Sequence, residues 1–246
     1  MDVAAVVKGF RAKLRQDGLW STFVLIWYRF TVRWIEHRLG IKTDTLITGA
    51  SLGYANAESR DYVPTNYWNL RRAFRLLTDI GSDDVFLDFG SGLGRVVIFA
   101  ASFHKFRRVV GIEVSEHLNA VARRNVERAL PRLRCQQIEI HTADVTRYVV
   151  SDDATVLYFF NSFVGELLVS SFAAIKASIR RSPRSVRLLC VYPRGFAFDA
   201  QIKRQQWLRR EAETDLPNGM QCALLKVECL ERGAWRKERG TAAQIA

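Results

Sequence analysis

The segment VFLDFGSGLGRVVIFAA, residues 85–101, constrains the fold of this chain more than any other stretch. Its first five residues predict a buried strand, GSGLG predicts a tight turn, and the apolar residues that follow predict a helix. Gly90, Gly92 and Gly94 allow a ligand to approach the backbone closely, and a helix beginning near Leu93 directs unpaired N–H groups at the turn. The segment therefore predicts a ligand-binding strand–turn–helix unit.

The glycine spacing and two nearby carboxylates indicate the kind of ligand. A dinucleotide fingerprint requires GxGxxG, whereas this chain has GxGxG, with Arg95 in the place of the last glycine. Asp88 lies at the end of the predicted strand. Glu113 ends a second predicted strand about 20 residues past the glycines, where a carboxylate can accept hydrogen bonds from both ribose hydroxyls of a nucleoside. The alternative is a glycine-rich turn of another α/β protein, with Glu113 a solvated strand end.

The sequence DFGSGLG resembles the first motif of the class I S-adenosylmethionine-dependent methyltransferases, and Glu113 at this spacing supports the resemblance. The resemblance implies that the turn lies against the methionine part of the cofactor and that Asp88 helps to position its amino group. The cofactor-binding residues that it implies in this region are Asp88, Gly90, Ser91, Gly92, Gly94 and Glu113.

The rest of the chain alternates predicted strands and helices. Further strands are expected at residues 108–114, 136–142, 155–160, 186–192, 206–214 and 220–230. Helices are expected at 69–80, between Ser115 and Pro131, and at 166–179. Two final strands joined at LPNG are the arrangement of class I methyltransferases. The expected fold is thus α/β, a Rossmann-like doubly wound seven-stranded sheet of order 3-2-1-4-5-7-6 over residues 49–240. An N-terminal basic amphipathic helical segment (1–48) precedes it and a tail (241–246) follows.

Three further segments narrow the resemblance. DYVPTNYWNL, residues 61–70, resembles the segment that precedes the glycine motif in the non-SET histone lysine methyltransferases of the disruptor-of-telomeric-silencing type. There a tyrosine and a threonine, matched by Tyr62 and Thr65, close over the cofactor. The YVP form is also similar to the mitochondrial lysine methyltransferases of the ATP synthase c subunit. Asp144 ends the third strand, where the family places an acidic residue to accept from the adenine amino group.

The segment YFFNSF, residues 158–163, ends the fourth strand with Asn161 and Phe163. The histone-type enzymes carry an asparagine and an aromatic residue here, beside the transferring methyl group. The resemblance therefore implies Asn161, Phe163 and Tyr62 as catalytic residues, with Asn161 also contacting the cofactor. A pocket of Phe160, Phe163 and Tyr192 is expected to keep a lysine amine neutral. The alternative is a turn-forming Asn161 that caps the next helix.

The resemblance also has limits that bear on the substrate. NSF differs from the NPPY or NPPF motif of nucleic-acid and glutamine amino methyltransferases, and the long N-terminal domain of the eukaryotic histone enzymes is absent. The sequence thus favours N-methylation of a protein lysine. Methylation of a nucleic acid or small molecule, or a non-catalytic anion- or membrane-binding module, remains open. No metal site is expected, since the four cysteines show no metal-type spacing.

The formal net charge of +12 suggests a polyanionic neighbour. Nucleic acid is not favoured, because basic clusters on helices usually form a solvated face. The two clusters in question are Arg123, Arg124, Arg128, Arg132 and Arg134, and then Lys176, Arg180, Arg181, Arg184 and Arg187.

The N-terminal segment carries an apolar stripe at helical spacing, with Arg29 and Arg33 toward one flank. Its eleven uncharged residues between Asp17 and Arg29 are too few to span a bilayer. Three interpretations remain: a lid over the cofactor, a dimer surface, or peripheral contact of residues 19–35 with an anionic membrane. A cytoplasmic enzyme, membrane-associated in the last case, is expected. The stripe consists of Leu19, Phe23, Ile26, Trp27, Phe30 and Trp34.

Overall fold

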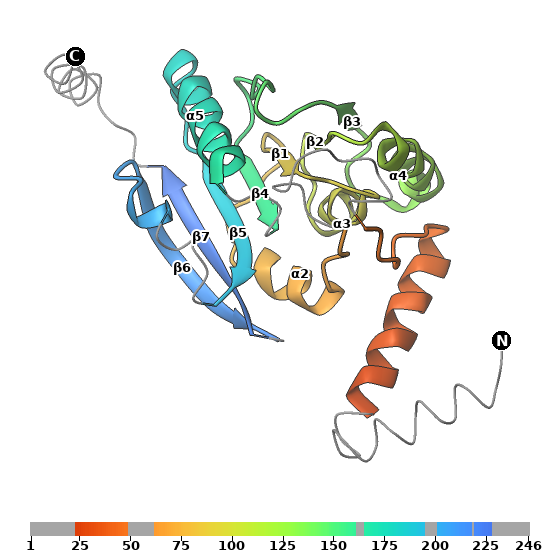
Figure 1. The fold of residues 1–246 in the computed structure, drawn as a ribbon. Coiled ribbons are helices and arrows are strands. Elements are labelled where there is room, and N and C mark those ends of the chain that lie inside the picture. The colour runs from red at the N-terminus through yellow and green to blue at the C-terminus, as the bar shows by residue number, and fades with distance from the viewer. Residues whose placement is uncertain (1–22, 49–61, 161–164, 195–200, 218, 228–246) are drawn as a thin grey trace, which may run out of the picture.

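The computed structural model describes residues 23–48, 62–160, 165–194, 201–217 and 219–227. Seven strands form one sheet of order β3-β2-β1-β4-β5-β7-β6, which confirms the predicted fold (Figure 1). The first five strands are parallel, and β7 pairs antiparallel with both β5 and β6. The strands are β1 (Val85–Phe89), β2 (Arg108–Glu113), β3 (Ile138–Thr142), β4 (Val156–Phe160), β5 (Arg187–Pro193), β6 (Leu208–Leu216) and β7 (Met220–Val227).

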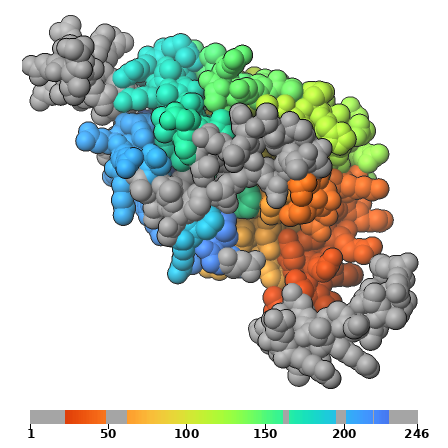
Figure 2. All heavy atoms as spheres, viewed as in Figure 1, coloured from red at the N-terminus to blue at the C-terminus, as the bar shows by residue number. Residues whose placement is uncertain are grey.

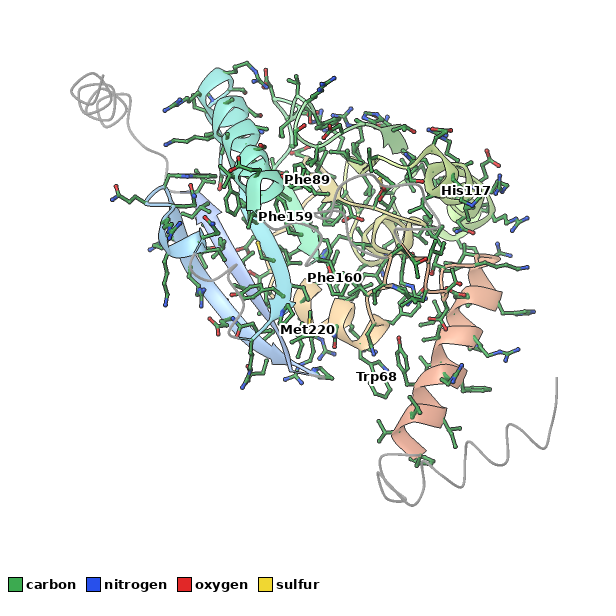
Figure 3. The ribbon with its side chains drawn as sticks, viewed as in Figure 1. Trp68, Phe89, His117, Phe159, Phe160 and Met220 are labelled. Carbon is green, nitrogen blue, oxygen red and sulfur yellow. The ribbon has the colours of Figure 1, made fainter. Side chains whose placement is uncertain are left out.

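Helices cover both faces of this sheet (Figure 1). One core cluster joins the sheet to α2 (Tyr67–Phe74), α3 (Arg95–Phe103) and part of α4 (Glu116–Ala129). The second cluster joins it to α5 (Gly165–Arg181). On that second face the rings of Phe89 and Phe159, from adjacent strands, stack with centroids 4.7 Å apart (Figure 3). The central strands are apolar on both sides because both faces are covered.

Helix boundaries follow local capping signals. Ser115 caps α4 as expected, since its side chain accepts from the N–H of Leu118. The predicted helix at 69–80 is wrong at both ends. Asn66 caps α2 by accepting from the N–H of Trp68, so the helix begins at Tyr67. After Phe74 the chain continues as tight turns, which keep Leu77 buried beyond the end of the helix.

The N-terminal helix, residues 23–39, has two apolar faces. One face, consisting of Tyr28, Val32, Ile35 and Leu39, packs against the core of the domain. Trp68, labelled in Figure 3, extends this contact from α2. Its ring lies edge-on to that of Tyr28, with the ring centroids 5.2 Å apart. The stripe identified in the sequence lies on the other face, and its five described members are all exposed; Leu19 lies outside the described residues. Among the helices described, none is long and apolar enough to cross a membrane.

Candidate functional site

The glycine turn connects β1 to α3 at the carboxyl end of the parallel strands. Gly90, Gly92 and Gly94 have φ values of 78°, 53° and 83°, a left-handed conformation that glycine adopts without steric cost. The N–H groups of Gly90 and Ser91 donate to the carbonyl of Ile112 at 2.8 and 2.9 Å, which holds the turn against β2. The predicted strand–turn–helix unit is therefore present, and its turn is fixed to the neighbouring strand.

Glu113 joins this turn to the end of β2. Its Oε2 accepts from the N–H of Gly92 at 3.1 Å, and its Oε1 accepts from the N–H of Ser115 at 3.0 Å. The residue is buried. Backbone N–H groups thus hold Glu113 in place at the carboxyl ends of the strands, where open α/β folds bind ligands. The interpretation of Glu113 as a solvated strand end is therefore wrong.

Asp88 supplies a second carboxylate at the same edge. It is buried, and among the described residues its Oδ2 has no hydrogen-bond partner, nor has the Oγ of Ser91. Burial, and then the charge of Glu113, raises the pKa of Asp88 well above its ordinary value. Native proteins rarely leave such atoms unpaired, so the site is chemically incomplete without a donor. A ligand ammonium group, such as that of S-adenosylmethionine, fits this requirement.

Asp88→Asn is therefore expected to stabilise the ligand-free protein at neutral pH and to weaken cofactor binding. Because folding raises the pKa of Asp88, the folded chain binds more protons than the unfolded chain between the two pKa values. The free energy of unfolding then falls as pH rises through that range, and asparagine removes this dependence. Thermal denaturation at pH 5 and 8 measures the effect, with the exposed Asp83→Asn as the matched control. An Asp88→Asn protein as pH-sensitive as the parent would contradict the assignment.

The ring of Tyr62 packs against the glycine turn and covers it. A Cβ placed on Gly92 would lie 2.3 Å from its Cε2, so the ring fills the space that a larger residue would need. The Tyr62 hydroxyl donates to the carbonyl of Thr43 at 3.0 Å, and its backbone pairs in both directions with Ile47. Burial raises the pKa of Tyr62, so the phenol stays neutral and remains a hydrogen-bond donor. Tyr62 is thus fixed by the chain that follows the N-terminal helix.

Arg95 is the residue whose role the sequence did not reveal. It is 2% exposed, and its guanidinium lies 4.6 Å from the centre of the Tyr67 ring. Arg95 departs from the dinucleotide spacing, but the sequence does not indicate its partners; the available signal is one arginine at the start of an otherwise apolar helix. Its guanidinium donates to Thr43 Oγ1 (2.7 Å), the Thr65 carbonyl (3.1 Å), Glu36 Oε1 (3.2 Å) and Asp44 Oδ1 (3.0 Å).

A second buried residue, Asn125 of α4, holds the same segment. Its Nδ2 donates to the carbonyls of Lys42 and Leu93, and its Oδ1 accepts from the N–H of Lys42. Residues 40–44 are therefore bound to the glycine turn through both Asn125 and Arg95. We call residues 40–48 the strap, because they connect the N-terminal helix to the residues that cover the turn.

The remaining predicted site residues differ in what the structure shows. Thr65 is buried, and its carbonyl accepts a hydrogen bond from Arg95, the residue that follows the glycine turn. Asp144 is exposed at the end of β3, where its Oδ1 accepts from the N–H and hydroxyl of Thr146. Asn161 and Phe163 lie outside the described residues. The structure thus brings Tyr62, Thr65 and the glycine-turn residues together, with Asp144 at a neighbouring strand end.

The prediction that Tyr192 lines the lysine pocket together with Phe160 is wrong. Phe160 of β4 pairs with Val191 of β5, so these two side chains lie on the same face of the sheet. Tyr192 follows Val191 in β5 and therefore points to the opposite face. Phe160 packs with the cluster beneath α2 and α3, whereas Tyr192 is buried in the cluster beneath α5. These two side chains cannot line one pocket.

Comparison with known proteins identifies relatives of this site. A family model described as "Histone methylation protein DOT1" matches residues 54–156, less than half of the chain. A curated protein-lysine N-methyltransferase from Saccharolobus islandicus (strain REY15A) is 28% identical over 107 residues, which are 44% of this chain and 64% of that protein. The residues that the family model matches include the glycine turn and Glu113. The chain spans less than two thirds of the length of the curated relative.

Solved structures agree on the fold. A precorrin 8W decarboxylase from Methanobacterium thermoautotrophicum superposes with a TM-score of 0.50 at 18% identity, covering 68% of this chain and 92% of that one. A structure titled StiE O-MT, residues 961–1257, gives 0.50 at 14% identity, covering 66% and 74%. The chain has the class I methyltransferase fold and resembles the DOT1-type enzymes.

Proposed function

We propose that this chain is an S-adenosylmethionine-dependent methyltransferase that methylates a lysine side chain of a protein. The observation that carries the proposal is the set of two buried carboxylates, Asp88 and Glu113, at a glycine turn covered by Tyr62. An unpaired carboxylate oxygen suits the ammonium of the cofactor, and a carboxylate fixed at the adjacent strand end suits its ribose. The DOT1-type match and the lysine methyltransferase relative support the same proposal.

The protein's part in the reaction is to position groups and exclude water. When bound, the cofactor supplies a sulfonium methyl group that requires only a nucleophile in line with it. A lysine amine must be neutral to attack, and desolvation beside Phe160 and Phe163 would lower its pKa. Asn161 would orient the amine by accepting a hydrogen bond from its N–H through the side-chain carbonyl oxygen. Asp144 would accept from the adenine amino group.

Glu113→Ala is expected to weaken binding of S-adenosylmethionine by about 1.5 to 3 kcal/mol, the range for a hydrogen bond to a charged group. Titration calorimetry measures the change for the cofactor and for its demethylated product. Because Glu113 also accepts from two backbone N–H groups, circular dichroism must show that the variant is folded. Folded parent protein that gives no binding signal with either compound would overturn the proposal.

The proposal of a protein substrate instead of a nucleic acid is supported by the two basic clusters, several of whose arginines already have partners within the chain. Arg123 pairs with Glu116, Arg181 pairs with Asp152, and Arg184 donates to the carbonyls of Ala154 and Ser182. Purified enzyme, labelled cofactor and a cell lysate treated with nuclease or with protease distinguish the two substrates. Label that survives nuclease but not protease, on methyl-lysine by mass spectrometry, supports lysine methylation, whereas nuclease-sensitive label refutes it.

Asn161→Ala is expected to lower the rate of methyl transfer about 100-fold, the order of magnitude for misplacing a reacting group by about 1 Å. Its melting temperature should remain that of the parent. The matched control is Ser162→Ala, which alters the neighbouring residue. A variant with the parental melting temperature and parental turnover on the identified substrate would show that the catalytic role of Asn161 is wrong.

A further inference from the structure

The outer face of the N-terminal helix exposes an unusual amount of apolar surface. Its large side chains are between 49% and 62% exposed and lie along one stripe about 17 Å long, at 1.5 Å per residue. Monomeric proteins rarely leave such contiguous surface open unless it contacts something. Figure 2 shows the helix, in red, at the margin of the molecule. The members of this stripe, which we call the outer stripe, are Phe23, Ile26, Trp27, Phe30 and Trp34.

The helix is fixed to the domain by its opposite face, so the outer stripe is turned away from the core. Val32 is 1% exposed on that inner face. Glu36, the one acidic residue of the helical residues 23–39, points inward and pairs with Arg95. The outer stripe is therefore exposed to solvent while the helix remains packed on the domain.

Within the described helix, residues 23–39, every charged side chain beside the outer stripe is positive. Arg29 and Arg33 lie on one flank at helical spacing, and Arg38 lies on the other, with its guanidinium 5.4 Å from the centre of the Trp34 ring. The apolar members include two tryptophans, which are enriched where a membrane meets water. The partner of this surface must therefore be apolar in its interior and negatively charged at its boundary.

We propose that the outer stripe binds the surface of an anionic phospholipid membrane, with the helix axis in the plane of the interface. The aromatic side chains would enter the headgroup boundary, and the flanking arginines would contact lipid phosphates. A second copy of the chain fits less well. A two-fold contact through this stripe would bring like-charged arginines together with no acidic side chain on the same face of either helix. This inference does not depend on methyl transfer.

Co-sedimentation of the full-length protein with vesicles tests the proposal. Vesicles of phosphatidylserine and phosphatidylcholine are compared with phosphatidylcholine alone, at low and high salt. We expect binding to the anionic vesicles that weakens with salt. Arg29→Gln with Arg33→Gln should lower the partition coefficient about 25-fold, since each arginine contributes about fivefold. Arg124→Gln on α4 with Arg132→Gln in the turn that follows α4 should not lower it.

A second pair of variants tests the apolar contact. Phe30→Ser with Trp34→Ser should lower partitioning at least about tenfold, because two large apolar side chains leave the interface. Val149→Ser with Val169→Ser removes exposed apolar side chains elsewhere and should have no effect. Sedimentation equilibrium without lipid completes the test. No binding to anionic vesicles, or a dimer that Phe30→Ser with Trp34→Ser dissociates, would overturn the proposal.

Discussion

Replacing Arg95 by leucine is expected to lower the free energy of unfolding by about 3 to 5 kcal/mol, the cost of removing one partner from a buried ion pair. The leucine would leave Glu36 without its cationic partner and the Thr65 carbonyl without its donor. It would also remove one of the two attachments of the strap that holds Tyr62 over the glycine turn, and Asn125 alone would remain. The affinity for S-adenosylmethionine should therefore fall as well. Urea denaturation and titration calorimetry measure the two effects.

Two variants show whether such a result comes from the buried guanidinium of Arg95, from its charge alone, or from the loss of any arginine. Arg107→Leu removes an arginine whose pair with Asp153 is largely exposed, and it should cost less than about 1 kcal/mol. Arg95→Lys keeps the charge but lacks the planar group that reaches four acceptors, so it should retain part of the stability and lose cofactor affinity. If Arg95→Leu unfolds at the parental urea concentration, the guanidinium network does not stabilise the fold.

Gly92→Ala is the second substitution with a large expected effect. Its Cβ would lie 2.3 Å from the Tyr62 ring, so the ring must leave the position in which it covers the turn. Its φ of 53° adds a strain of about 1 to 3 kcal/mol. We expect the affinity for S-adenosylmethionine to fall at least about tenfold. A tenfold loss corresponds to about 1.4 kcal/mol, which lies within the range given for the backbone strain.

Two other glycines serve as controls for Gly92→Ala. Gly219 has a φ of 69° but open space around its absent Cβ, so Gly219→Ala shows the cost of strain without a clash. Gly81 has neither a positive φ nor a neighbour within 4 Å, so Gly81→Ala should change nothing. A Gly92→Ala protein that binds the cofactor as the Gly219→Ala protein does would show that Tyr62 is not needed over the turn.

The sequence predicted the parts of the site that depend on local patterns. The strand, the glycine turn and Glu113 follow one another within 30 residues, so hydrophobic runs and glycine spacing identified them. The sheet order followed from the resemblance to class I methyltransferases. Helix ends were less accurate, because the cap at Asn66 and the turns after Phe74 leave the apolar spacing unchanged.

The hydrogen bonds of Arg95 could not be predicted in the same way, because they join residues 30 to 59 positions apart. The N-terminal helix shows a related difficulty. Apolar residues at helical spacing define a face, but they do not say whether that face is buried. In this helix the less aromatic face, around Val32, is buried and the more aromatic one is exposed. The Glu36–Arg95 pair lies on the buried side of the helix, and the sequence spacing gives no sign of it.

The position of β7 between β5 and β6 has a consequence for synthesis of the chain. On the ribosome, β5 is complete by Pro193, but its hydrogen-bonding partner extends to Val227. For a few seconds, at 5 to 20 residues per second, β5 is an unpaired and almost wholly apolar edge. Such edges pair readily with other chains. Nascent chains halted between β5 and β7 are therefore the species most exposed to aggregation, and a chaperone that shields strand edges would act during this interval.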